Sequence, residues 1–389
     1  MREGWTENSL GELAKFRRDR LDPLSLDSAH LLCHWSIPAL DEFGGPLWEP
    51  AGKIGSHKFR VRENAVVFSL LNPRIPRFAL VAGGDDVVCS TEFAVMQPTD
   101  LVHETFLFLL ASSNIFQKVV GSLASGTTKS RERVKPSDLE DVSIILPPLN
   151  EQRRIVDVMS FFDAYIDALQ QQADSARTAR NAVLHELLSA GINDWTETTL
   201  GGVAVFYNGK AYKQDELLAS GKYRVLRVGN FFSNGNWYWS DLELDANKYC
   251  DFGDLLYAWS ASFGPRIWTD EKVIYHYHIW KVEVKPLQVE KKFLYYWLED
   301  DVQRMKRDAG TGSIMMHITK GEIEARAIAL PPLGEQKRIV EIVSSMDDVI
   351  QSTKQAVTDA KVLRSGLLSD LLSGEHEIPA SYDSLLGVA

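Results

Sequence analysis

Two stretches of this 389-residue chain carry nearly the same sequence. Residues 146–160 read LPPLNEQRRIVDVMS, and residues 330–344 read LPPLGEQKRIVEIVS. The match continues without a gap to the ends of both segments, where LLS at 187–189 corresponds to LLS at 371–373. The period is far longer than that of a solenoid repeat. The chain is therefore an internal duplication, and each copy is expected to be a domain followed by a helix.

Each copy of the motif predicts a long helix with one apolar face. Pro147 and Pro148 end a strand-like run at 142–146, and Asn150 is placed to cap the helix that follows. Gly191 and Gly374 are expected just beyond the helix ends. Each helix would span about forty residues, or roughly 60 Å, and a lone helix with one apolar stripe needs a partner. We therefore predict that the two helices pack on each other. In the first copy the apolar residues recur in near-heptad register at Ile155, Val158, Phe162, Ile166 and Leu169.

The sequence outside the helices predicts two globular domains. Their starts echo each other, because Trp5-Thr6-Glu7 returns as Trp195-Thr196-Glu197, but the rest has little likeness. Short β-like runs broken by Gly, Asn and Pro indicate an α/β (α+β) fold in both. These runs lie at 65–71, 78–81, 223–228 and 273–284. We divide the chain into a first domain (1–149), a first helix (150–191), a second domain (192–333), a second helix (334–374) and a tail (375–389).

Bulk composition narrows the class of protein. The chain has no run of apolar residues long enough for a membrane helix, and its start lacks the apolar core of a signal peptide, so we expect a cytoplasmic protein without a membrane partner. Cys33, Cys89 and Cys250 are far apart in sequence and predict reduced thiols. The net charge of −11 argues against binding polyanions over the whole surface, but it leaves room for a local basic groove.

Catalytic motifs are missing from the sequence. We find no phosphate-binding loop, no dinucleotide fingerprint and no Asn-Pro-Pro-Tyr box of amino-methyltransferases. His276 and His278 would share one face of a strand, but no third metal ligand is evident. Asp270 with Glu283 and Lys285 matches a nuclease pattern that arises readily by chance. We therefore expect no catalytic residue, metal or cofactor in this chain.

Recognition chemistry is better represented. Hydroxyl and basic side chains suit phosphate contacts, and Asn and Arg suit the edges of adenine and guanine. The alternatives are that the basic runs are solvated faces, that the aromatic residues beside these amides build a core, and that the Asn-Gly pairs form turns. In the first domain the candidate DNA-binding residues are Lys53, Lys58, Arg60, Arg74, Arg77, Thr127, Thr128, Lys129, Arg131 and Arg133. In the second they are Asn208, Lys210, Lys213, Arg227, Asn230, Asn234, Asn236 and Arg266.

The doubled LPPLxEQxRIV, followed by a long helix ending in LLS, resembles the specificity subunit of type I restriction-modification systems. The domain starts WTENSLGELAKF (5–16) and WTETTLGGVAVFYNGKAYK (195–213) resemble the starts of that family's target-recognition domains. So do the blocks at 89–93, 253–260 and 310–313. One departure is that the loop after Gly126 is basic, whereas its counterpart at 312–317 is apolar, which puts equal roles for the two loops in doubt.

The resemblance implies a function for the whole chain. Two target-recognition domains would be separated by two antiparallel, coiled-coil-like helices with pseudo-two-fold symmetry. Each domain would read one half of a split, asymmetric site in double-stranded DNA, and the helices would set the spacing. Two modification (methyltransferase) subunits would supply S-adenosylmethionine, and restriction (translocase and nuclease) subunits would use ATP and Mg²⁺. The candidate docking residues for the modification subunits are Pro147, Pro148, Glu151, Gln152, Pro331, Pro332, Glu335 and Gln336.

Two other functions stay open at this point. The chain could be a scaffold or decoy that binds restriction-system proteins rather than DNA. It could also be a nuclease or methyltransferase fragment that acts alone, although it lacks the motifs of either.

Overall fold

The computed structural model describes residues 2–126, 132–191, 194–232, 235–260, 263–308 and 318–385. The chain forms two compact units, one made of Met1–Gln170 with Gln355–Ala389 and the other of Gln171–Lys354. We call them unit 1 and unit 2. The division falls inside the two long helices, so each unit contains one globular region and a part of both helices. Each unit is described below by itself.

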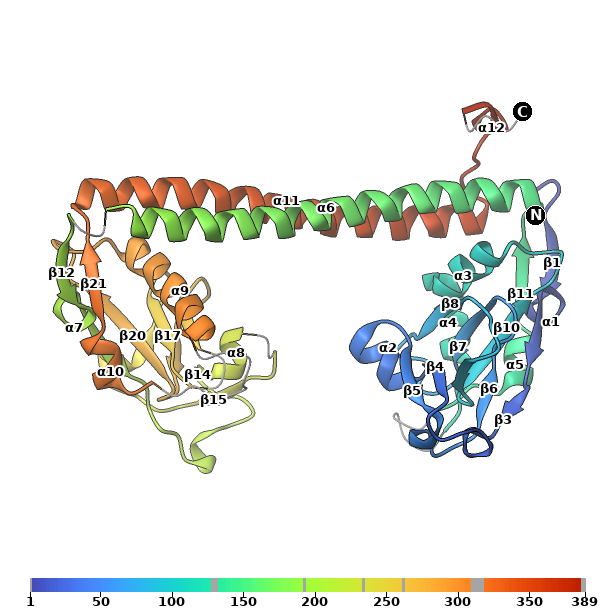
Figure 1. The fold of residues 1–389 in the computed structure, drawn as a ribbon, viewed down its shortest axis with the longest axis horizontal. Coiled ribbons are helices and arrows are strands. Elements are labelled where there is room, and N and C mark those ends of the chain that lie inside the picture. The colour runs from blue at the N-terminus through green and yellow to red at the C-terminus, as the bar shows by residue number, and fades with distance from the viewer. Residues whose placement is uncertain are drawn as a thin grey trace. The chain divides into compact units, whose positions relative to one another are not determined.

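Unit 1 has three sheets in a mixed α/β fold (Figure 1). Their strand orders are β1-β11, β2-β10-β7-β8 and β3-β6-β9-β4-β5, and all pairs are antiparallel except β4 with β9. The strands are β1 (Thr6–Ser9), β2 (Ala14–Arg17), β3 (Arg20–Leu21), β4 (Leu31–Trp35), β5 (Leu47–Pro50), β6 (Lys58–Arg60), β7 (Ala65–Ser69), β8 (Phe78–Val81), β9 (Val87–Ser90), β10 (Phe93–Pro98) and β11 (Ser143–Leu146). The helices are α1 (Leu10–Leu13), α2 (Ile37–Phe43), α3 (Glu104–Ser112), α4 (Asn114–Ser122), α5 (Pro136–Glu140) and α12 (Tyr382–Leu385), with 3-10 turns η1 (Pro23–Ser25) and η2 (Ala51–Lys53).

Unit 2 follows the same plan. Its sheets have the orders β12-β21, β13-β20-β17-β18 and β15-β14-β19-β16, and β14 with β19 is the parallel pair. The strands are β12 (Thr196–Thr199), β13 (Ala204–Asn208), β14 (Tyr223–Leu226), β15 (Tyr238–Ser240), β16 (Tyr249–Cys250), β17 (Leu255–Ala258), β18 (Gly264–Ile267), β19 (Val273–Tyr275), β20 (Ile279–Val284) and β21 (Ala327–Leu330). The helices are α7 (Leu200–Val203), α8 (Val228–Phe232), α9 (Lys291–Asp308) and α10 (Lys320–Ala325), with 3-10 turns η4 (Gln214–Glu216) and η5 (Ala246–Lys248).

The predicted duplication is thus confirmed in regions where the sequence no longer shows it. In both units a strand, a short helix and a second strand open the globular region. The first strand pairs with the strand that precedes a long helix, in matching register: Thr6 faces Leu146, and Thr196 faces Leu330. The second strand joins a four-stranded antiparallel sheet of the same order. The two globular regions therefore share one core topology, and they differ in the extra edge strand β3 of unit 1, in their helices and in their loops.

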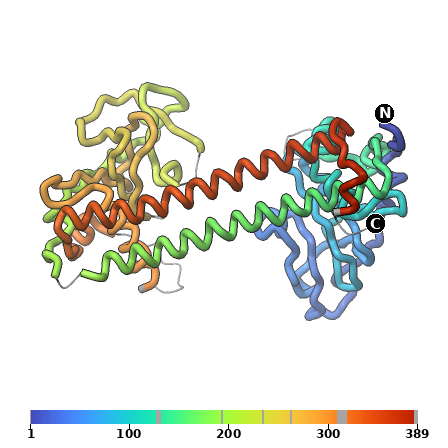
Figure 2. The backbone as a smooth tube through the Cα atoms, turned by 90° about the horizontal axis from the view of Figure 1, so that it is seen from above, coloured from blue at the N-terminus to red at the C-terminus, as the bar shows by residue number. Residues whose placement is uncertain are grey.

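The two long helices are α6 (Leu149–Ser189) and α11 (Leu333–Ser373). Figures 1 and 2 show that within each unit their segments run side by side in opposite directions. In unit 1, Ile166 of α6 packs against Val357 and Ala360 of α11. In unit 2, Leu184 and Leu188 share a core with Ile339 and Val343. The predicted packing of the two helices on each other is confirmed inside both units.

Both helices begin one residue earlier than predicted. The Pro148 carbonyl accepts hydrogen bonds from the backbone N–H groups of Glu151 and Gln152, at 2.9 and 3.0 Å. Asn150 therefore lies inside the first turn and is not the cap. The physical reason is that a proline carbonyl accepts as well as any other, so the helix starts directly after the Pro-Pro pair.

The glycines that follow the two long helices, Gly191 and Gly374, have different structural roles. Gly374 has φ +76°, the left-handed conformation expected of a residue that closes a helix. Gly191 does not have a positive φ, so the prediction that it closes α6 in this way is wrong. A Cβ at Gly191 would instead lie 2.3 Å from Nε1 of Trp195, and glycine is required for that close approach. Gly374 likewise packs on the ring of Trp5, the residue that corresponds to Trp195.

Candidate nucleic-acid interface

In unit 1, two of the predicted DNA-binding cations have partners within the unit, and one of them, Lys58, is buried. Lys58 on β6 is buried, and its Nζ donates to the carbonyl and hydroxyl oxygens of Ser56 at 3.0 and 2.6 Å. Burial lowers the pKa of Lys58. Arg77 makes two hydrogen bonds to Asp41 at 2.6 and 2.8 Å and ties α2 to the start of β8. This bond holds the pKa of Asp41 below its usual range. Lys58 is buried and so cannot reach DNA as predicted, whereas Arg77 is only engaged by Asp41 and its assignment to DNA stays a prediction.

Other candidates in unit 1 reach the surface. Lys53 is exposed at the end of η2. Arg74 and Arg133 are exposed, and each forms one ion pair, with Glu132 at 2.9 Å and Glu92 at 2.8 Å. Arg60 lines a cavity of about 200 Å³, together with Arg17 and Arg62. Thr127, Thr128, Lys129 and Arg131 lie outside the described residues.

One surface feature of unit 1 was not predicted from the sequence. Trp48 is 64% exposed on β5, which is an edge strand, and Phe43 at the end of α2 is also exposed. An exposed aromatic ring offers a face on which a base can stack. The only signal in the sequence was an aromatic residue in a short alternating run, and that pattern does not distinguish the two faces of a strand.

Unit 2 brings several of the predicted residues together at the turn between β19 and β20. Lys210 and His276 form an isolated bridge, with Lys210 N donating to Tyr275 O at 3.0 Å. The ring of Tyr212 stacks on His276, at 6.2 Å between centroids. Burial lowers the pKa of His276 to about 4, with further contributions from His278 and Arg227, so this imidazole is neutral at pH 7. A neutral ring can accept or donate a hydrogen bond without adding charge.

Basic side chains flank this turn. The Arg227 guanidinium lies over the ring of Tyr238 at 5.0 Å and has no ion-pair partner among the described residues. Lys213 is exposed, while Lys210 pairs with Glu216 at 3.1 Å. These contacts leave Arg227 and Lys213 as the two cations of this set best placed to meet an anion.

The asparagine residues of unit 2 that were predicted to bind DNA fall into two groups, one with a structural role and one with exposed side chains. The Asn230 side chain accepts from Arg227 N and donates to Asn236 O, so it holds the loop in shape. The side chains of Asn208 and Asn236 are exposed. Arg266 is exposed, and it donates to Phe231 O and lies over that residue's ring. Asn234 lies outside the described residues.

The aromatic residues of unit 2 divide between buried and exposed positions. Phe231, Tyr257 and Trp280 are fully or almost fully buried, as the core alternative expected. Tyr238 and Phe232 are exposed, and Trp259 is half-buried, with its Nε1 donating to Tyr277 O at 2.8 Å. The core interpretation is therefore right for the first group only.

The predicted strand through His276 and His278 is wrong, because β19 ends at Tyr275, His276 forms only an isolated bridge, and residues 277–278 form a turn. The two imidazole centroids are 4.9 Å apart, and within the described ranges no group of three His, Cys, Asp or Glu side chains could hold a metal ion. Asp270 pairs with Arg224, and Lys285 donates to Gly202 O, so these members of the nuclease pattern are engaged elsewhere. All three cysteines are free, as predicted.

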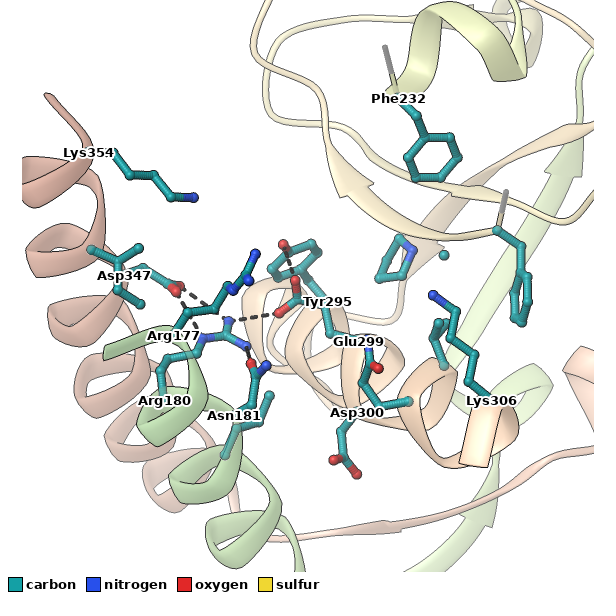
Figure 3. A pocket seen from close by; sticks show the side chains of 17 residues that line it. Arg177, Arg180, Asn181, Phe232, Tyr295, Glu299, Asp300, Lys306, Asp347 and Lys354 are labelled. Carbon is teal, nitrogen blue, oxygen red and sulfur yellow. Dashed lines mark hydrogen bonds and ion pairs between the residues drawn. The ribbon is translucent and has the colours of Figure 1, made fainter. Parts of the chain in front are cut away.

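A cavity of about 410 Å³ lies in unit 2 between α6, α9 and α11 (Figure 3). Its wall contains Arg180, which donates to Asp347 at 2.9 Å and to Glu299 at 2.7 Å. Burial alone would lower the pKa of Arg180, but these carboxylates outweigh it and raise that pKa. Arg177, Lys306 and Lys354 also line the cavity. Arg180 is thus a structural tie between three helices, and the cavity beside it has a basic rim.

Comparison with known proteins agrees with this geometry. The family model for the type I restriction modification DNA specificity domain matches the chain twice, at residues 45–176 and 192–359. The chain belongs to this family. The two matches fall one on each copy of the duplicated plan, and together they cover well over half of the sequence.

Named relatives of this specificity-family chain cover almost its whole length. The MjaVIII specificity subunit of Methanocaldococcus jannaschii is 22% identical, with 97% of this chain and 94% of the relative aligned. The putative MjaX specificity subunit of the same organism is 21% identical over 82% of this chain and 80% of the relative. A solved chain from a study of complex assembly and conformational transition of the type I R-M system has a TM-score of 0.65. It is 20% identical and covers 96% of this chain and 98% of that one, and it supports the fold.

The residues of the family motif that were predicted to dock partners are mostly internal. Gln152 and Gln336 have no exposed surface. Gln152 accepts from His103 N at 2.8 Å and donates to the carbonyls of Leu101 and Pro147. Gln336 makes the same three bonds, to Glu290 N and to the carbonyls of Gln288 and Pro331. Direct docking through these two amides is corrected, because every polar atom of each is used inside its own unit.

The remaining docking candidates differ between the copies. Pro147 and Pro331 are buried, whereas Pro148 and Pro332 are exposed. Glu151 is buried and accepts from Trp5 Nε1 at 3.1 Å and from Arg2 at 2.7 Å. Its counterpart Glu335 is exposed. In the part of the chain that the structure describes, no helix is long and apolar enough to cross a membrane.

Proposed function

We propose that this member of the specificity family reads a bipartite, asymmetric site in double-stranded DNA, with unit 1 reading one half and unit 2 the other. The observation that carries the proposal is one topology built twice with different surface loops. The shared core topology of the two globular regions would hold two recognition surfaces in the same way. Unequal loops, such as the basic segment after Gly126 and the neutral His276 turn, offer different groups to the bases. A site read by such a pair would not be a palindrome.

The helices α6 and α11 are proposed to fix the distance between the two half-sites, as the body of a dimeric regulator does. Each helix contributes to both units, so a change in helix length changes both together. The chain would act without a catalytic centre of its own. Modification subunits would bring S-adenosylmethionine, and restriction subunits would bring ATP and Mg²⁺.

Mapping of methylated bases in host DNA, with and without this gene, tests the proposal. We expect one split motif with two different halves to lose its methylation when the gene is removed. Exchanging the globular region of unit 2 for that of a relative should alter one half and leave the other unchanged. A motif that changes in both halves would contradict the division of labour between the units.

Catalysis by the chain alone is the competing function. The purified chain, incubated with plasmid, Mg²⁺ and S-adenosylmethionine, should neither cut nor methylate DNA. Sequence-specific footprinting with a modification subunit present should protect the split motif. Turnover by the chain alone would favour a catalytic fragment, and the absence of any protected site would favour a decoy that binds protein.

A further inference from the structure

The two copies of the repeated motif present the same residues with different exposure. Glu151 and Arg154 near the start of α6 are both only 8% exposed. Glu335 and Arg338, which occupy the same places in α11, are both exposed. Further along this face Val158 is half-buried, while its counterpart Ile342 is 44% exposed. The same surface is therefore covered in unit 1 and open in unit 2.

The cover in unit 1 is the C-terminal segment Glu375–Leu385, which returns from the end of α11 to the start of α6 (Figure 2). Arg154 donates from Nε and Nη2 to the two carboxylate oxygens of Asp383, at 2.7 and 2.6 Å. Such a two-bond pair is among the stronger charge-assisted contacts in proteins. Arg2 adds a bridge between Glu151 and Glu377, at 2.7 and 2.9 Å.

An apolar contact accompanies the ion pair. Ile378 is buried in the same core cluster as Ile155 and Met159, and Tyr382 packs against that cluster. The carbonyl of Ile378 also accepts from Arg154 at 3.4 Å. The segment is thus held by an aliphatic anchor and, five positions later, by an aspartate on the guanidinium.

The difference in exposure between these two surfaces does not come from a difference in how the two helices are joined to their globular regions. Gln152 and Gln336 make the same three hydrogen bonds, so both helices leave their globular regions in the same way. Both helices also carry the Glu-Gln-x-Arg sequence at the same place. Among the residues that the structure describes, Arg338 has no hydrogen bond and no ion pair, whereas Arg154 has both. The free guanidinium of Arg338 corresponds to the group that binds Asp383 in unit 1. The exposed Ile342 corresponds to Val158, which packs against the core cluster that contains Ile378.

We propose that the surface formed by Glu335, Arg338 and Ile342 is a docking site for an acidic segment of a partner protein. That segment would have the chemistry of the C-terminal tail, with an aliphatic residue followed by an aspartate in a short helix. The tail would close the equivalent surface of unit 1 to the same partner. The proposal relies on the proposed function only for the expectation that a modification subunit supplies the segment. The two repeat surfaces are then unequal, and one partner copy would meet a closed site.

A labelled peptide with the sequence of Glu375–Leu385 tests the proposal on the intact chain, without DNA or other subunits. We expect one equivalent to bind, and binding to weaken at least tenfold when the peptide carries Asp383→Asn or the chain carries Arg338→Gln. Lys337→Gln removes a neighbouring exposed charge and is the matched control, which should have little effect. Footprinting on DNA remains a separate readout, so failure here would not resemble failure of DNA recognition.

The surface of unit 1 that the C-terminal segment covers allows a second test of the proposal. Asp383→Asn in the chain itself should loosen the tail and raise the number of equivalents of the wild-type peptide that bind from one to two. The proposal is overturned if the intact chain binds no peptide, or if Arg338→Gln and Lys337→Gln weaken binding equally. Self-association that depends on Arg338, measured by sedimentation, would also overturn it and assign the surface to a second copy of this chain.

Discussion

At the scale of single residues, the repeated glutamine has a structural role. Gln152 and Gln336 each satisfy one backbone N–H and two carbonyls at the point where a long helix leaves its globular region. The sequence shows that this residue occurs twice, but repetition alone does not distinguish a docking side chain from an internal one. An amide with one acceptor and two donors fits three buried backbone groups, which explains why it is completely buried.

Gln336→Leu should therefore destabilise unit 2. The change leaves Glu290 N and two carbonyls without partners, and each unsatisfied buried group costs about 1–3 kcal/mol. We expect the free energy of unfolding in urea to fall by at least about 2 kcal/mol. Lys337→Leu, one position further along on the exposed side, should change it by less than about 0.5 kcal/mol. Equal effects of the two substitutions would show that the internal bonds contribute little.

The contact of Arg154 with Asp383 should depend on pH. The hydrogen bond from Arg154 lowers the pKa of Asp383 below its ordinary value of about 3.9. The stabilisation is therefore complete above that ordinary value and is lost as the pH falls through the lowered pKa. The protection factors of the amides of residues 375–385, which compare the measured exchange rate with that of an unfolded chain at the same pH, should be high at pH 6 and fall in strong acid. In Asp383→Asn they should already be low at pH 6, and a protected tail in that variant would contradict the role of the ion pair.

At the scale of elements, the same arginine–aspartate ion pair joins α6 and α11 in both units, but its surroundings differ between the units. Arg180 binds Asp347, and Arg364 binds Asp163 at the corresponding positions. Only Arg180 also meets Glu299 of α9, and its side chain is 7% exposed against 18% for Arg364. The sequence predicted the correspondence of the two arginines. It could not predict the third partner, because α9 lies in a region where the copies no longer share sequence.

Asp347→Asn should consequently cost more stability than Asp163→Asn. Asp347 also accepts from the hydroxyl of Tyr296 at 2.7 Å, so its loss affects two donors. Hydrogen bonds to charged groups contribute about 1.5–3 kcal/mol, but the side chain of Asp347 is 39% exposed and solvent screens part of this, so we expect a loss of about 1–2 kcal/mol. The more exposed Asp163 should cost less than about 1 kcal/mol. Urea denaturation of both variants measures the difference, and a reversed order would contradict it.

The basic loop after Gly126 should contribute affinity without selecting a base. Replacing Lys129, Arg131 and Arg133 by neutral residues should weaken binding to many DNA sequences alike. The dependence of log K on log salt should fall by about one unit for each phosphate that the loop no longer neutralises. Binding measured over a salt series gives this slope. Loss of one particular base preference would instead mean that the loop reads bases.

The sequence predicted the helices, the duplication and the mixed fold, because long apolar periodicity and repeated motifs survive divergence. It did not predict that both globular regions share one core topology, since strands of two to six residues leave no periodicity to compare. His276 and His278 illustrate the same limit, because the run through 273–284 looks continuous in the sequence but is interrupted between Tyr275 and Ile279. Among the site residues, the burial of Lys58 and the pairing of Arg77 with Asp41 were not predicted, because a charge in a sequence does not reveal its partner in the fold.

At the scale of the whole molecule, the net charge of −11 and the local basic groups have different consequences. Under the proposed function, overall repulsion from DNA would keep non-specific binding weak, while local cations would act only where both half-sites fit. Specificity of that kind depends on the spacing of the two halves as much as on their sequences. The two helices are the elements that can set this spacing, because each belongs to both units.

Removing about seven residues from the middle of both α6 and α11 should therefore shorten the spacing and leave both half-sites unchanged. Seven residues shorten a helix by about 10 Å, which corresponds to about three base pairs of DNA. A deletion of about two helical turns keeps the apolar stripe of each helix in phase, so the helices can still pack on each other. Methylation mapping of the deleted chain with its partner subunits measures both quantities at once. If the half-site sequences change while the spacing does not, the helices do not set the distance, and the loops of the two units must determine the whole site.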